Sequence, residues 1–321
     1  MTAVVVARQV TVPRVTRRAV AVLLLALLAA LAVFGPMLAP YPGEIVVGPI
    51  SAPPSADFLL GTDPSGMDVL SRTLIAARTD LAIAASAALL CTTAGIVLGL
   101  LAGMAESRGG FVGPLGRGIA RGADLLDAVP AVLLGLVVVS FFGRSAVSIA
   151  VVSGLVLTPL QLRLVRAEVL RVRNDAYLDA ARMAGMSELT LTVRHVLPNS
   201  IWAARENAST MMNIGLLLTS TLGFLGAGLP TPTPEWGAML ALGAADASVG
   251  RWWSALVPFL VLIAVGATTA WVGSNLWTTG RASRPRRAGL TRRGRDEPTS
   301  RRPSPRPSPT SDQTHPGGVL P

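Results

Sequence analysis

The sequence predicts an all-α integral membrane protein with six transmembrane helices, and three observations lead to this prediction. The 321 residues are 51% hydrophobic and only 14% charged, whereas a soluble domain has about a quarter charged residues. The mean hydropathy is +0.54. Uncharged stretches of about 20 residues, the length that crosses a bilayer, recur along the chain. This composition argues against soluble enzymes, disordered proteins and fibrous proteins.

Six stretches are apolar and long enough, or nearly so, to cross a membrane. The third contains Asp127 near its start, and the brief turn Gly143–Arg144 joins the third to the fourth. The fifth becomes rich in proline and glycine towards its end. The predicted spans are 19–38, 81–104, 125–142, 145–162, 207–234 and 252–280.

The first stretch has an alternative interpretation as a cleaved signal peptide. Its apolar core, 19–34, is somewhat long for a signal peptide, and the segment 36–40 offers a poor cleavage site. We therefore interpret it as a membrane span.

The arginines predict the orientation, because cytoplasmic loops carry an excess of positive charge. With both termini placed in the cytoplasm, 24 of the 28 basic residues lie inside. They occupy the N-terminal arm 1–18, the connection before the third span, the long connection 163–205 and the tail 281–321. Outside remain Arg72, Arg78, Arg144 and Arg251.

The net charge of +10 raises the alternative of nucleic acid binding. Most inner arginines flank predicted spans, where they fix topology and lie near anionic lipid headgroups. The segment 281–321 is rich in arginine, proline and serine, so we predict a disordered cytoplasmic tail. We expect contact with membrane lipid and no nucleic acid partner.

The chemistry open to this chain is limited. It contains no lysine, which excludes a phosphate-binding P-loop and Schiff-base chemistry. A single cysteine, Cys91, excludes an intramolecular disulfide and a cysteine-built metal site. His195 and His315 are too few for a histidine-built metal site. We expect neither an enzyme nor a bound cofactor or metal.

The predicted spans are nearly empty of the ionisable residues that a gradient-driven carrier uses. Asp124 and Asp127 lie at the inner edge of the third span, and Glu206 at that of the fifth. We interpret each as a solvated charge at the end of a helix rather than as a proton relay. A stand-alone secondary carrier or channel is the alternative function, but a separate ATPase subunit is the simpler energy source.

The connection 163–205 is the best candidate for docking such a subunit. Its composition favours a short helix with Tyr177, Ala181 and Ala184 on one face and Leu178 beside it. Gly185 is expected to cap that helix. We expect Ser187 to start a second helix and Leu197-Pro198-Asn199 to end the unit. A plain amphipathic connector on the membrane surface fits the spacing equally well.

Several strings resemble one family. Asp179-Ala180-Ala181, then Gly185, then the string 195–198 resembles the EAA loop of bacterial ABC-importer permeases. The fuller string 194–199, Arg-His-Val-Leu-Pro-Asn, resembles the dipeptide/oligopeptide/nickel branch and its C-type permease. Further strings agree with that branch in order: 60–72, 163–170, 224–228 and 234–237.

This resemblance implies an ABC type I importer permease fold in the bacterial plasma (inner) membrane. It implies a second, B-type permease subunit, two ATP-binding-cassette subunits and an extracytoplasmic substrate-binding protein as partners. It assigns coupling to the ATPases to Asp179, Ala180, Ala181, Gly185, Leu197 and Pro198. The substrate would be a peptide, nickel or a related small solute.

The sequence departs from the family pattern at three places. Asp179 replaces the usual glutamate, which keeps the acid but shortens its reach. Met67 stands where the branch usually has arginine. The usual ending after the sixth span is absent. The resemblance therefore carries over the class of protein, but not the details of docking or of the exit from the sixth span.

The outer loop 39–80 is expected to end in an amphipathic stretch. Leu70, Leu74 and Leu81 would lie on the bilayer, and Asp68, Arg72 and Arg78 would face water. The loop either helps to receive the binding protein or packs on the partner permease. The possible receptor contacts are Asp63, Asp68, Arg72, Glu235 and Trp236, with Asp246.

The remaining aromatic and sulfur residues receive structural interpretations. Trp236, Trp252 and Trp253 fit an interfacial aromatic belt. Cys91 is expected to face lipid or the core, and His195 to be a structural residue of the loop.

Overall fold

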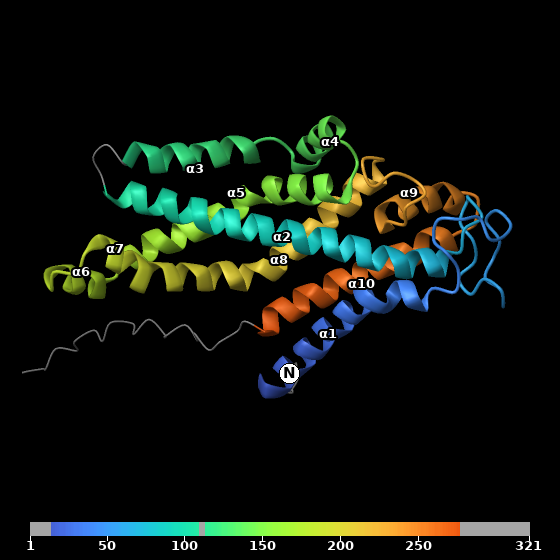
Figure 1. Ribbon diagram of the computed structural model, residues 1–321, viewed down its shortest axis with the longest axis horizontal. Coiled ribbons are helices and arrows are strands. Elements are labelled where there is room, and N and C mark those ends of the chain that lie inside the picture. Colours follow the sequence, from blue (N-terminus) through green and yellow to red (C-terminus); the bar gives the residue numbers. More distant parts are fainter. Residues whose placement is uncertain (1–13, 109–112, 277–321) are drawn as a thin grey trace, which may run out of the picture. The chain divides into compact units, whose positions relative to one another are not determined.

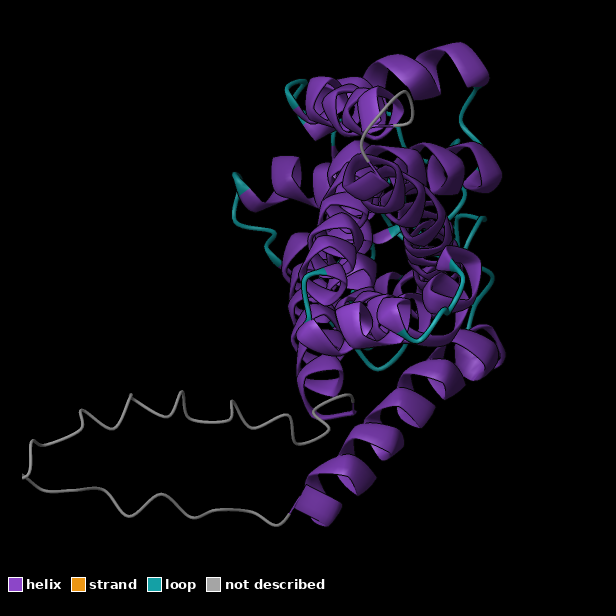
Figure 2. Ribbon diagram, turned by 90° about the vertical axis from the view of Figure 1, so that its left-hand side faces the viewer, coloured by secondary structure: helices purple, strands orange, loops and turns teal. Residues whose placement is uncertain are grey.

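The computed structural model describes residues 14–108 and 113–276, and within them the regular structure is helical, apart from an isolated bridge between Thr62 and Asp68 (Figures 1 and 2). The helices are α1 (Arg14–Leu38), α2 (Val69–Arg108), α3 (Gly113–Asp127), α4 (Ala131–Phe142), α5 (Ala146–Arg173), α6 (Ala176–Met183), α7 (Glu188–Leu191), the π-helical turn η1 (Thr192–Val196), α8 (Leu197–Phe224), α9 (Trp236–Ala247) and α10 (Trp253–Leu276). The predicted all-α fold class is confirmed. Most of the N-terminal arm and the tail 281–321 with His315 lie outside the described residues.

Four of the described helices are long and apolar enough to cross a membrane: α1, α2, α5 and α10. The bent pair α3 and α4 would make a fifth span if the two helices are taken together as a single span. The fifth predicted span, 207–234, begins in α8 and runs ten residues past its end at Phe224. Helix α8 also carries Arg205 and Glu206 and is not among these helices. The count of six spans and the sides of the termini stay predictions.

The third predicted span is broken rather than straight. Its helical residues belong to α3 and α4, whose axes meet at 89°. The break falls before Pro130, which has no N–H to donate to the preceding turn and favours an extended conformation in its neighbour. The proline in the sequence was the available signal for this bend.

The bundle is held together along α2 by a row of glycines spaced four residues apart. They lie on one face of α2 and allow α5 to approach closely, as small residues do between membrane helices. A methyl group built on each would come within 2.6–2.7 Å of an α5 side chain: Gly95 against Gln161, Gly99 against Val165 and Gly103 against Val169.

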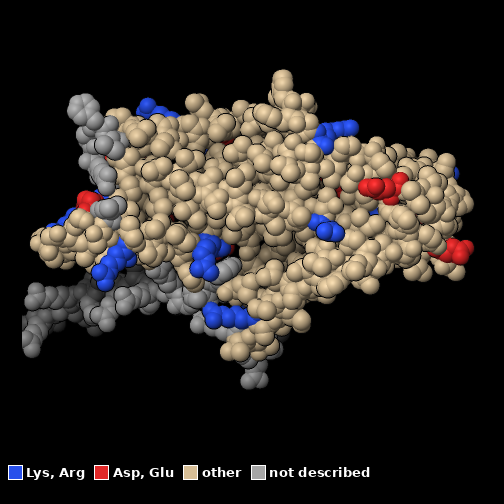
Figure 3. All heavy atoms as spheres, in the orientation of Figure 1, with Lys and Arg blue, Asp and Glu red and all other residues tan. Residues whose placement is uncertain are grey.

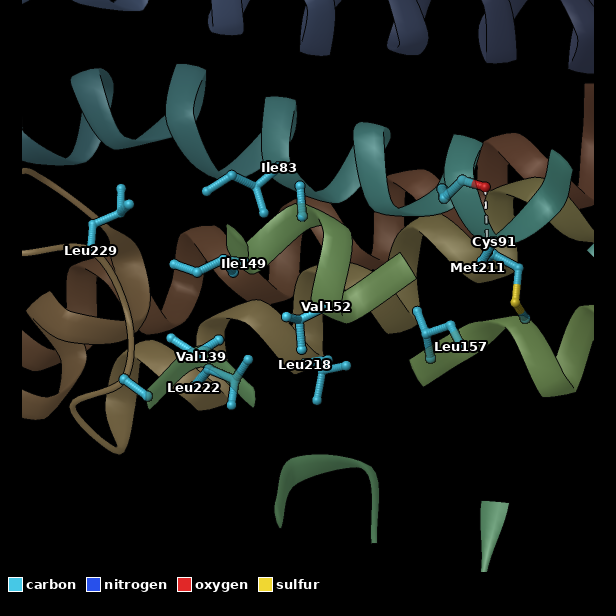
Figure 4. Packing of buried hydrophobic residues seen from close by; sticks show 13 residues of the cluster. Ile83, Cys91, Val139, Ile149, Val152, Leu157, Met211, Leu218, Leu222 and Leu229 are labelled. Atoms are coloured by element: carbon cyan, nitrogen blue, oxygen red, sulfur yellow. Dashed lines mark hydrogen bonds between the residues drawn. The ribbon is translucent and has the colours of Figure 1, made fainter. Parts of the chain in front are cut away.

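A buried apolar cluster joins α2, α4, α5 and α8 (Figure 4). Cys91 is fully buried in this cluster, and its Sγ lies 3.3 Å from the carbonyl oxygen of Ala88. Of its two expected environments, Cys91 therefore has the core-facing one.

The two ends of the helical bundle are built differently (Figure 1). One end carries α6 and α7, and the other carries α9 and the segment 39–68. Figure 3 shows that much of the face between these ends is without charged side chains. Both ends hold residues that the sequence marked as functional.

Candidate functional site

Helix α6 ends where the sequence predicted, at a glycine in the left-handed conformation. Gly185 has a φ of +83°. Its N–H donates to the carbonyl of Arg182, and the N–H of Met186 donates to that of Ala181. This pair of hydrogen bonds is the Schellman motif, which satisfies the last carbonyls of a helix and favours glycine.

One face of α6 packs on the bundle and the other is open. Leu178 is 1% exposed and lies in an apolar cluster with Val172, Leu191 and Val196. The open face includes Tyr177, Asp179, Ala180, Met183 and Ala184. Of the residues expected on one face, Tyr177 and Ala184 are exposed and Ala181 is half-buried, so small alanines lie on the free side of α6.

Ion pairs connect α6 to its neighbours. The Nη1 of Arg182 lies 2.6 Å from Asp179 Oδ1, and its Nε lies 3.0 Å from Glu188 Oε1. The other oxygen of Glu188 lies 3.0 Å from Nη2 of Arg173, at the end of α5. Burial raises the pKa of Glu188, but the hydrogen bonds from Arg182 and Arg173 outweigh it and leave the pKa below its ordinary value.

The second part of the unit differs from the prediction. Ser187 does accept a hydrogen bond from Thr190 N–H at 3.3 Å, as an N-cap would. Leu197 and Pro198, however, do not end the unit, because they form the first turn of α8. Pro198 follows the π-helical turn η1 without a break in the helical backbone, and the N–H of Leu197 donates to the carbonyl of Thr192.

His195 has the structural role that the sequence suggested. Its ring packs against Tyr177 of α6 in an edge-to-face arrangement, with centroids 5.8 Å apart. Its carbonyl accepts a hydrogen bond from Asn199 at 2.8 Å. The contact ties α6 to the turn η1.

At the opposite end, five of the six expected receptor contacts are buried, and the sixth, Asp246, is half-buried. The exposed fractions of the five are 5% for Asp63, 2% for Asp68, 3% for Arg72, 2% for Glu235 and 0% for Trp236. In this conformation none of these five side chains presents a surface to a soluble receptor, so the expectation of direct contact is corrected for them.

Arg72 explains why the amphipathic interpretation of the outer loop was wrong. It lies in the first turn of α2, which begins at Val69, so the stretch is part of the bundle and not a surface helix. Its Nη1 donates to the carbonyls of Gly43 and Pro232, and its Nε lies 3.4 Å from Asp63 Oδ2. Met67, which stands where the resembled family usually has arginine, also contacts Arg72.

Asp68 is buried by its contacts with the first turn of α2, which follows it in the chain. Its Oδ2 accepts hydrogen bonds from the N–H and the hydroxyl of Ser71, at 2.8 and 2.6 Å. It thus faces the chain and not water. Arg78, by contrast, is exposed as predicted.

Glu235 and Trp236 join the start of α9 to α2 and α8. The Oε2 of Glu235 accepts from Leu229 N–H at 2.6 Å, and its carboxyl lies where a side chain on Gly223 or Gly228 would have to be. Burial raises the pKa of Glu235, while the hydrogen bond from Leu229 and the charge of Arg144 lower it less.

Trp236 is not part of an interfacial belt, which corrects that prediction. Its indole N–H donates to the carbonyl of Thr73 at 3.0 Å, and its backbone N–H to Asp80 Oδ2 at 2.8 Å. Asp80 is 2% exposed and was missed, since an acid one residue before a predicted span gives no sign of a partner 156 residues away. Trp252 is 56% exposed.

Each of the three acids considered as proton relays has a side-chain partner within hydrogen-bond distance. Arg163 of α5 lies 3.1 Å from Asp124 Oδ1 and 2.7 Å from Asp127 Oδ2, which fastens α3 to α5. Glu206 accepts from the indole N–H of Trp202 at 3.1 Å. Within residues 14–108 and 113–276, no group of three or more His, Cys, Asp or Glu side chains could hold a metal ion.

Comparison with known proteins gives one consistent result. A family model described as "binding-protein-dependent transport system inner membrane component" matches residues 95–276. The chain is 38% identical to the di/tripeptide transport system permease protein DppC of Pseudomonas aeruginosa, over 72% of this chain and 77% of that protein. It is 34% identical to the glutathione transport system permease protein GsiD of Pectobacterium atrosepticum, over 67% and 70% of the two chains.

Among solved structures, the chain is similar to one from the MetNI methionine ABC transporter in inward-facing conformations. The TM-score is 0.52 at 15% identity, and the match covers 62% of this chain and 91% of that one. At this identity the likeness concerns the fold alone.

Proposed function

Because this chain belongs to the family of binding-protein-dependent transport system inner membrane components, as a dipeptide/oligopeptide ABC-importer permease, we propose that it couples peptide uptake to ATP hydrolysis through α6. In this proposal the chain forms half of the translocation pathway and hydrolyses nothing itself. A second permease, two ATPase subunits and an extracytoplasmic binding protein complete the transporter in the bacterial inner membrane.

The observation that carries the proposal is the way α6 is presented. It lies at one end of the bundle (Figure 1), with Asp179, Ala180 and Ala184 exposed and Leu178 anchored beneath. Small side chains allow another protein to approach closely, while the buried leucine links any displacement of α6 to the bundle. Leu197 and Pro198 would act behind it by starting α8.

The proposed substrate class follows from the relatives, which are permeases for di/tripeptides and glutathione. We propose a short peptide as cargo. Nickel remains a second cargo to be tested by the same measurement.

Reconstitution in liposomes tests this function. With the second permease, the ATPases, the binding protein and ATP present, we expect uptake of a labelled dipeptide that stops when ATP or the ATPases are omitted. The chain alone, given a proton gradient, should take up nothing. Gradient-driven uptake by the lone chain would contradict the proposal.

A further inference from the structure

Helix α6 is short and reaches the rest of the described unit through a few identifiable side chains. Leu178 packs in the apolar cluster, Tyr177 stacks edge-to-face on His195, and Arg182 pairs with Glu188. Between α6 and α7 lies Gly185, whose surroundings are open: nothing is within 4 Å of a Cβ built there. A turn of this kind would let α6 move relative to α7 unless another contact held the two helices together.

Glu188 makes a contact of this kind. It belongs to α7, and its two oxygens pair with different helices: Oε2 with Arg173 of α5 and Oε1 with Arg182 of α6, each at 3.0 Å. One carboxylate therefore joins the elements on both sides of the Gly185 turn. Asp179 pairs with the same Arg182 at 2.6 Å, so the arginine side chain is held against the surface of α6.

The α5 partner is firmly fixed. The side chain of Arg173 is 7% exposed, and its Nη1 lies 3.2 Å from Met104 Sδ of α2. The Glu188 side chain is 41% exposed, so its pairs are partly hydrated and add little stability by themselves. Each arginine donates one charge-assisted hydrogen bond to a different oxygen of Glu188, so the carboxylate has a defined place between the two helices.

We propose that Glu188 is a positioning residue for energy coupling. It holds α7 to α6 across the Gly185 turn and holds both to the end of α5, so that a displacement imposed on α6 is passed to α5 and, through α7, to α8. The proposal rests on the function proposed above, and it adds a residue that lies within the EAA loop but is not one of its motif positions.

The test uses the complete reconstituted transporter and measures peptide molecules imported per ATP hydrolysed. Glu188→Gln should still assemble with the ATPases and hydrolyse ATP, but its import per ATP should fall by about 2- to 30-fold. Glu188→Asp should recover part of the loss. Arg171→Ala is the matched control: it breaks an arginine–glutamate pair between two residues of α5 and should leave the ratio unchanged.

A double-mutant cycle identifies the bridge itself. If Glu188 acts through Arg182, the double variant Arg182→Ala with Glu188→Gln should be no worse than the more affected single variant. Additive losses would overturn the bridge. A wild-type import ratio in Glu188→Gln, or a loss of assembly with the ratio preserved, would overturn the positioning role.

A second measurement does not need the ATPases. A spin label at position 183, which is 84% exposed on α6, in a Cys91→Ala full-length chain should become more mobile when Glu188 is changed to Gln. Unchanged mobility would overturn the proposal. Uptake by the wild-type transporter without ATPases would instead refute the proposed function, so the two failures are distinguishable.

Discussion

Gly99 of α2 lies directly against Val165 of α5, and a methyl group on Gly99 would be 2.7 Å from the Cβ of Val165. Real side chains do not approach so closely. Gly95 and Gly103 make equivalent contacts one turn away on each side. Because α2 and α5 form the most extensive helix pair of the described unit, this row sets the spacing of the bundle.

We predict that Gly99→Leu destabilises the protein by at least about 1–3 kcal/mol, because it forces α2 and α5 apart. The control is Gly118→Ala in α3, where a Cβ meets nothing within 4 Å and alanine is the better helix former. Thermal unfolding in detergent should show a lower Tm for the leucine variant and an unchanged or higher Tm for the alanine variant. Equal Tm values would contradict the packing argument.

The sequence supported the helical membrane fold because apolar length is a local signal. The row of glycines at positions 95, 99 and 103 was equally visible in the sequence, but its partner helix was not. The bend at Pro130 also had a local signal that the hydropathy pattern concealed, since residues 125–142 remain apolar through it.

A second prediction concerns the buried pair at the other end of α2. Arg72→Ala should destabilise the protein by about 3–5 kcal/mol, because it leaves Asp63 without its positive partner and two carbonyls without a donor. Arg78→Ala, on the exposed side of the same helix, should change stability little. Denaturant titration of the two variants measures the difference, and similar losses for both would refute this account of Arg72.

The burial of Arg72 also marks the limit of inference from sequence at this site. Its acceptors belong to Gly43 and Pro232, 29 and 160 residues away. An amphipathic pattern shows which residues share a face, but not whether that face meets water or another part of the chain. The cap at Gly185 could be predicted because its cause lies within a few residues.

A third prediction follows from the raised pKa of Glu235. The folded state holds this proton at a pH where the unfolded chain has released it, so the contribution of Glu235 to stability is complete below the ordinary glutamate pKa, about 4.3. It is lost as the pH rises through the higher pKa of the folded state. Glu235→Gln is neutral throughout and still offers an oxygen to Leu229 N–H.

The Tm difference between Glu235→Gln and the wild type should therefore be larger at pH 7 than near pH 4.5, in favour of glutamine. Glu235→Ala removes the acceptor for Leu229 N–H as well and should lower the Tm at every pH. A Tm difference for glutamine that is constant with pH, or greater at low pH, would show that burial does not raise the pKa of this carboxyl group.

The last prediction concerns the left-handed turn after α6. Within this chain a Cβ at Gly185 meets nothing within 4 Å, so substitutions affect the fold of the loop through the backbone φ of +83°. A left-handed conformation costs about 1–2 kcal/mol for an ordinary residue, less for asparagine and more for a β-branched one. ATP-driven uptake should therefore fall in the order Gly185→Asn, Gly185→Ala, Gly185→Val, with equal amounts of each variant in the membrane. Wild-type uptake by the valine variant would show that coupling does not require this conformation, because the backbone strain at the turn is greatest in that variant.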